Sequence, residues 1–122
     1  MIDTTTSCYV GTLGKEDKGE TVEMKGIKYD KDKPLAGILL DFSRSLKAVV
    51  DVGTFGAKKY SRGNWLNVEN GIEKYTDAMV RHFLDEAANH IDKESGLSHL
   101  AHLAWNILAV LELTLRDKEK ES

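Results

Sequence analysis

The segment from Leu97 to about Arg116 constrains the fold most, because it is apolar almost throughout yet carries polar residues in one row. His99, His102 and Asn106 are separated by three and four residues, so in a helix they lie on one stripe. A helix that is apolar nearly all round is central to its domain or buried between subunits. The polar interruptions argue against a membrane span. We therefore expect a helix buried in protein, and no membrane partner.

A second helix is predicted earlier in the chain, beginning near Pro34, because proline suits the first turn of a helix. It is expected to continue to about Val52, after which Gly53 and Gly56 end or kink it. Its apolar face would consist of Leu39, Phe42, Leu46, Val49 and Val50.

A further helix is predicted between these two, from about Ile72 to Asn89. Its buried side is expected to consist of Ile72, Tyr75 or Thr76, Met79, Phe83 and Ala87. Its polar side would consist of Ala78, His82, Asp85, Glu86 and Asn89.

The chain as a whole is expected to be mainly α: a compact three-to-four-helix bundle over residues 28–116, with a solvated tail at 117–122. The arm formed by residues 1–27 is irregular or carries short strands, for which Tyr9-Val10 and Thr21–Met24 are the candidates. The length of 122 residues suits one domain, and 41% hydrophobic residues is ordinary for a folded one.

Charge and cysteine content narrow the function classes. A formal net charge of −3 gives no reason to expect duplex nucleic acid as a partner. Cys8 is the only cysteine, so neither an internal disulfide nor a thiolate zinc cluster can form. The polar start of the chain does not resemble a secretion signal, so we expect a cytoplasmic protein.

Two histidines three residues apart on one helix can place both imidazoles on one metal ion or one phosphate. The alternative for His99, His102 and Asn106 is a hydrogen-bonded core network that fixes helix register. We favour a functional stripe, because polar groups on an apolar helix are costly unless they are paired or used.

Additional candidates precede this stripe. His82 shares a predicted helix face with Asp85 and Glu86, which can orient its ring, although this face can also be simply the solvated side of the helix. Asp92 is the best single carboxylate candidate, since it lies between the helices that carry His82 and His99.

The segment of residues 53–65 is interpreted as a basic and aromatic loop that grips a nucleotide. Lysine and arginine can bind phosphate, and aromatic rings can stack on a base. An ordinary surface loop is the alternative, with Trp65 as a core anchor. The candidate residues are Lys58, Lys59, Tyr60, Arg62, Asn64 and Trp65.

Four segments together resemble a phage and prophage family named for the N-terminal domain of dATP/dGTP diphosphohydrolases. They are KYDKDKP (28–34), GAKKYSRGNW (56–65), RHFLDEAANHID (81–92) and ESGLSHLAHLAWN (94–106), and the resemblance spans roughly residues 27–113. It implies a metal-dependent reaction in the host cytoplasm that converts dATP or dGTP to the monophosphate and pyrophosphate. The positions that match the family are Lys59, Tyr60, Asn64, Trp65, Arg81, His82, Asp92, Ser95, Gly96, His99, His102 and Asn106. For an enzyme of this kind we expect His82, Asp92 and His99 to be catalytic and, with His102, to hold the metal. The expected nucleotide-binding residues are Lys58, Lys59, Tyr60, Arg62, Asn64, Trp65, Arg81, Ser95, His102 and Asn106.

The expected cofactor is a divalent metal: Mg²⁺, Mn²⁺, Zn²⁺ or Co²⁺. All-α pyrophosphohydrolases that use magnesium hold it with several carboxylates in Glu-x-x-Glu and Glu-x-x-Asp patterns on facing helices, and Mg²⁺ prefers oxygen ligands. A histidine-rich site suits Zn²⁺, Mn²⁺ or Co²⁺ better.

The sequence leaves two other functions open. One is a phage sponge without a metal, which sequesters a nucleotide immune signal such as a cyclic oligonucleotide or an ADP-ribose derivative. The other, ranked last, is a structural oligomer whose polar stripe only sets register. For an enzyme and for a sponge alike, the expected partner is a small purine nucleotide. The apolar helix from Leu97 to about Arg116 predicts a homodimer or larger assembly.

Overall fold

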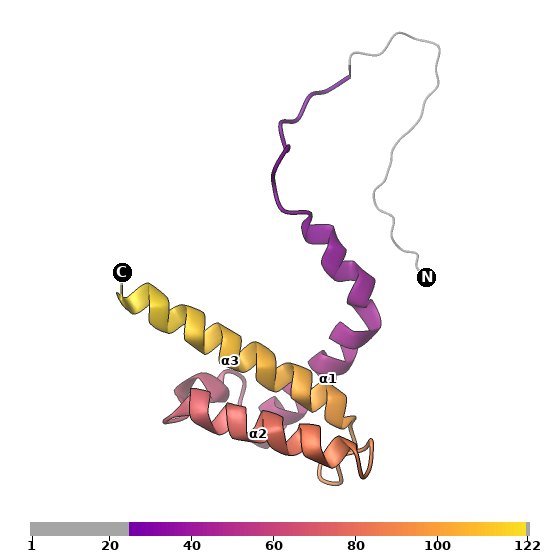
Figure 1. The fold of residues 1–122 in the computed structure, drawn as a ribbon, viewed down its shortest axis with the longest axis vertical. Coiled ribbons are helices and arrows are strands. Elements are labelled where there is room, and N and C mark those ends of the chain that lie inside the picture. The colour runs from indigo at the N-terminus through magenta and orange to yellow at the C-terminus, as the bar shows by residue number, and fades with distance from the viewer. Residues whose placement is uncertain (1–24, 122) are drawn as a thin grey trace. The chain divides into compact units, whose positions relative to one another are not determined.

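The computed structural model describes residues 25–121, so the strands expected at Tyr9-Val10 and Thr21–Met24, and Cys8, lie outside the described residues. The chain divides into two units after Pro34. In the first, residues 25–34 are exposed, and the Lys33 N–H donates to the Asp30 carbonyl to close a turn. The second contains η3 (Ala36–Phe42), α1 (Ser43–Lys59), η4 (Asn64–Asn67), α2 (Gly71–Glu86) and α3 (His99–Glu121), coloured along the chain in Figure 1.

The mainly α fold predicted from the sequence is confirmed. Among residues 25–121 the structure has three α-helices and no named strand, and one isolated antiparallel bridge joins Ile91 to Ser98. Helices α2 and α3 pack side by side, and α1 packs on α3 (Figure 1). Within the described range, no helix combines the length and apolar character that a bilayer crossing demands.

The prediction that α1 ends at Gly53 or Gly56 is wrong, because the helix continues through both to Lys59. A Cβ atom on residue 53 would lie 3.1 Å from Trp105 Nε1, so glycine lets α1 approach the Trp105 ring of α3 closely. The start also differs from the prediction, since the chain from Ala36 forms a 3₁₀ helix in which Leu39 and Phe42 are exposed.

The predicted orientation of α2 is also wrong in part. Ile72, Tyr75 and Met79 are partly buried as expected, but Phe83 is 63% exposed. His82, assigned to the polar side, is partly buried instead. The packed face of α2 is therefore rotated toward His82, because the polar stripe of α3 gives that ring partners inside the fold.

The third helix is buried where the sequence predicted its polar stripe. His99, His102 and Asn106 are all buried, with 5–9% of their surface exposed. The helix begins at His99, where Ser98 Oγ accepts the Leu100 N–H at 3.0 Å as an N-terminal cap. It continues to Glu121, beyond the predicted end near Arg116, so residues 117–121 belong to α3.

Three aromatic rings join η4, α2 and α3. Trp65, Tyr75 and Trp105 meet edge to face, with ring centroids 5.5–6.3 Å apart. The Tyr75 hydroxyl donates to the Trp65 carbonyl at 3.1 Å. This cluster holds the middle of α3 against α2.

Candidate metal and nucleotide site

Three predicted site residues from different parts of the chain converge at one end of the α2–α3 pair. His82 comes from the last turns of α2, Asp92 from the connecting loop, and His99 from the first turn of α3. One ligand atom from each lies within 4.8 Å of the other two, a spacing from which one ion can be held. We call these three residues the metal group.

The loop between α2 and α3 fixes the position of Asp92. Its backbone N–H donates to the Leu97 carbonyl at 2.8 Å, and its carbonyl accepts from Gly96, which adopts the left-handed conformation at φ +74°. The Ser95 N–H donates to Asp92 Oδ2 at 2.9 Å. The carboxylate is thus held by a turn of its own chain.

The geometry of the two histidines suits a transition-metal ion. Their Nδ1 atoms are 2.9 Å apart. Two nitrogen ligands, each about 2.05 Å from one ion, lie about 2.9 Å apart when their bonds are perpendicular and about 3.3 Å apart in a tetrahedron. The same distance fits a hydrogen bond between the rings, with one Nδ1 protonated and the other accepting. Two imidazoles and one carboxylate form a donor set typical of Zn²⁺, Mn²⁺ or Co²⁺ rather than Mg²⁺.

His102, the fourth predicted metal ligand, lies beside the metal group without belonging to it. Its ring stacks on His82, with centroids 4.5 Å apart and planes at 8°. Ser95 Oγ accepts the Leu97 N–H and lies 2.7 Å from His102 Nε2, so its own proton can be donated to that nitrogen. His102 therefore supports the His82 ring by stacking against it.

Asn106 has a local role in this arrangement. Its side-chain Nδ2 donates to the His102 carbonyl at 2.8 Å, one turn earlier in α3. This bond gives the buried amide a partner on its own helix.

Burial keeps the neighbouring rings neutral. It lowers the pKa of His82, against the nearby Asp92 charge, which acts to raise it. Burial likewise lowers the pKa of His102. Neutral imidazole is the form that binds a metal ion. Burial acts to raise the pKa of Asp92, but the Ser95 backbone N–H and the nearby histidines hold it below its ordinary value, so the carboxylate is ionised.

The end of α1 closes one side of the site. Phe55 meets the His102 ring edge-on at 6.5 Å. One turn later, Lys59 forms an ion pair with Glu94, which lies in the same loop as Asp92 and Ser95. This hydrogen bond raises the pKa of Lys59, so its ammonium is a stable cation at the edge of the site.

Other predicted nucleotide-binding residues have varied positions. Trp65 lies in the aromatic cluster, which corresponds to the core-anchor alternative. Arg81 precedes His82 on α2 and is exposed. The predicted loop at residues 53–65 is wrong in its first half, because exposed Lys58 lies in the last turn of α1. The remaining candidates follow the end of α1, where Asn64 is partly buried and Tyr60 and Arg62 are exposed.

Two acidic residues next to the metal group were missing from the predicted site. Glu94 pairs with Lys59, and Glu86, one turn after His82, contacts His90 through Oε2. Glu86 Oε1 is buried without a hydrogen-bond partner among the described residues. The four-residue spacing placed Glu86 on the predicted face of His82, where its Oε2 pairs with His90.

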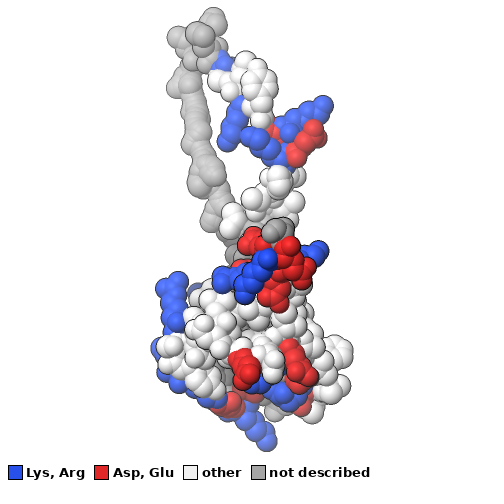
Figure 2. Space-filling view, turned by 90° about the vertical axis from the view of Figure 1, so that its left-hand side faces the viewer, with Lys and Arg blue, Asp and Glu red and all other residues white. Residues whose placement is uncertain are grey.

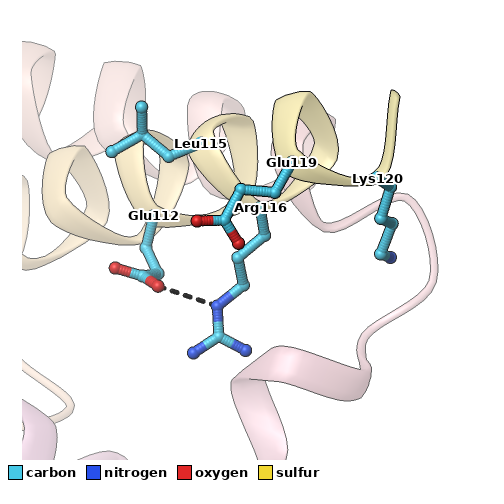
Figure 3. Close-up of a pocket in the computed structure, with 5 residues that line it drawn as sticks. All are labelled: Glu112, Leu115, Arg116, Glu119 and Lys120. Atoms are coloured by element: carbon cyan, nitrogen blue, oxygen red, sulfur yellow. Dashed lines mark hydrogen bonds and ion pairs between the residues drawn. The ribbon is translucent and has the colours of Figure 1, made fainter. Parts of the chain in front are cut away.

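The metal group is separate from two surface hollows. One hollow, of about 680 Å³, is lined by the C-terminal part of α3, including Glu112 and Arg116 (Figure 3). Another, of about 520 Å³, lies between the start of α2 and the same part of α3. Neither includes a residue of the metal group.

Comparison with known proteins agrees with the resemblance found in the sequence. The family model described as "dATP/dGTP diphosphohydrolase, N-terminal" matches residues 23–122. The chain belongs to this family. It is also 40% identical over 92 residues to a protein of Salmonella phage PMBT28 named "dATP/dGTP diphosphohydrolase". The match covers 74% of this chain but only 30% of the phage protein, and no solved structure matches the chain.

Proposed function

We propose that this domain handles purine deoxynucleoside triphosphates at a divalent-metal site formed by His82, Asp92 and His99. The observation that carries the proposal is the convergence of these three ligands from three separate segments within 4.8 Å. The name of the phage relative supports dATP and dGTP as the substrates. The reaction would be hydrolysis to the monophosphate and pyrophosphate, in the cytoplasm of the host cell.

Three protein ligands leave positions on an ion free for water and phosphate oxygens, as in catalytic metal sites. A divalent ion there would supply positive charge to the phosphate oxygens. His102 and Ser95 hold the ligands in place through the stacking and hydrogen-bond contacts on His82 and Asp92.

The chain's own cations can add to phosphate binding. Lys59 lies at the edge of the site through its pair with Glu94, and Arg81 adjoins His82. Both side chains are solvent-exposed, so a triphosphate can recruit them without disturbing the core.

A second candidate is sequestration of a nucleotide without cleavage. The composition of the metal group favours it, because the group contains one carboxylate, whereas magnesium-dependent pyrophosphate chemistry uses several. Such a nucleotide sponge would bind its ligand through imidazole, hydroxyl and cationic groups.

The first test measures metal binding. The 122-residue protein is stripped with a chelator and titrated with Zn²⁺, Mn²⁺, Co²⁺ and Mg²⁺ by calorimetry. We expect about one transition-metal ion per chain and at least a tenfold loss of affinity in His82→Ala and His99→Ala. His90→Ala is the matched control, since that side chain is 83% exposed and lies outside the metal group. Equal affinity in all four proteins would refute the proposed site.

The second test identifies the chemistry. The metal-loaded protein is incubated with dATP, dGTP and dCTP, and the products are separated by chromatography. Released pyrophosphate from the purine nucleotides supports hydrolysis, while intact nucleotide that stays with the protein supports sequestration. If dATP and dGTP are neither cleaved nor retained, the proposed function is wrong.

A further inference from the structure

Helix α3 has a packed face and an exposed apolar face on opposite sides. One face meets α1 and α2 and contains the buried His99, His102, Asn106 and Ala109. The other, which we call the outer stripe, is spaced by three and four residues and so runs along one side of the helix. Its five large side chains are 48–56% exposed. The outer stripe consists of Leu100, Ala104, Ile107, Leu108, Leu111 and Leu115.

The outer stripe carries no charge over four turns. Between residues 100 and 115, Glu112 is the one acidic or basic residue of α3 besides the buried His102. Glu112 accepts a 2.7 Å hydrogen bond from Arg116, and Figure 3 shows both pointing away from Leu115. The charged and apolar sides of the helix are therefore distinct.

Within residues 35–121, no other α-helix covers this face. The other α-helices of residues 35–121, α1 and α2, pack against the opposite side of α3, where the site and the aromatic cluster lie. The buried hydrophobic residues of the described part are small: Val52, Ala101 and Ala109. Figure 2 shows one side of the molecule, on which wide uncharged surface lies between groups of charged side chains.

We propose that a second copy of this chain docks on the outer stripe, α3 against α3. Leu100, Ala104, Ile107, Leu111 and Leu115 follow steps of four, three, four and four residues, the spacing of a helix–helix seam. In a two-fold pair the same surface faces itself, so an uncharged stripe meets no like charge on its partner.

The area available suits a small interface. A large side chain has roughly 150–200 Å² of surface, so five that are half exposed contribute about 400–500 Å² per copy. Two stripes then bury about 800–1,000 Å², below the roughly 1,200 Å² at which stable specific interfaces begin, so the stripe suits a weak dimer.

The test is the oligomeric state of the 122-residue protein by light scattering, from about 1 to 100 µM. We expect a dimer of about 27 kDa, twice the 13.6 kDa chain. Leu111→Lys places a charge in the middle of the stripe and should shift the protein to a monomer with unchanged helical circular dichroism. Glu112→Lys, one residue further on, places the same lysine on the charged side and should leave the dimer intact.

Leu115→Lys provides a second variant, because the exposed last turns of α3 tolerate substitution without unfolding. It should also weaken the dimer at least tenfold. A wild-type monomer throughout the concentration range overturns the proposal. So does a dimer that persists in both Leu111→Lys and Leu115→Lys.

Discussion

The close contact between α1 and Trp105 predicts opposite effects for two glycine substitutions three residues apart. Alanine in a helix interior is favoured over glycine by about 0.5–1 kcal/mol. At Gly56, a new Cβ meets no atom within 4 Å, so Gly56→Ala should gain this stability in full. At Gly53, the new Cβ would lie 3.1 Å from Trp105 Nε1.

Trp105 has little freedom to move away, because its ring is packed edge-on between Trp65 and Tyr75. Overpacking of this kind costs about 1–3 kcal/mol, which exceeds the helix-propensity gain. Gly53→Ala should therefore be destabilised by about 0.5–2 kcal/mol. The free energies of unfolding of the two variants should differ by about 1–3 kcal/mol.

The assay is urea unfolding followed by circular dichroism at 222 nm, at one fixed protein concentration, because an oligomer gains stability with concentration. Wild type, Gly53→Ala and Gly56→Ala are compared by their midpoints and slopes. If Gly53→Ala gains as much stability as Gly56→Ala, the close approach of α1 to Trp105 is refuted.

Three further predictions concern the site and its supports. Burial lowers the pKa values of His82 and His102, so below about pH 6.5 the unfolded chain binds more protons than the folded one. The metal-free protein should therefore lose unfolding free energy as the pH falls from 7.5 to 5.5. An unchanged urea midpoint over this range would contradict the prediction. Trp65→Ala should cost about 2–3 kcal/mol of stability, less than a fully buried ring, with little change in nucleotide affinity by calorimetry; the reverse pattern would favour base stacking. Ser98→Ala removes the N-terminal cap of α3 and should lower the unfolding free energy by about 1 kcal/mol in the same urea assay, whereas no loss would argue against the cap.

Some features of the site could be predicted from the sequence. Three- and four-residue spacing places His99, His102 and Asn106 on one stripe wherever the helix lies, and the cost of burying polar groups requires them to have partners. The loop position of Asp92 between two helices likewise predicted that it would lie near His82 and His99, and it does.

The sequence by itself thus determined the helices, their periodicity and the polar stripe, because these depend on local geometry. Only the tertiary structure decided which face of α2 turns inward. His82 and Phe83 are neighbours in sequence, and apolar residues occur on both sides of that helix, so periodicity alone cannot choose between them. Likewise, the sequence around Gly53 predicts a helix end, because Trp105, which packs against Gly53 in the folded protein, lies 52 residues later. The side chain that needs the missing Cβ comes from another helix, and that contact exists only in the folded protein.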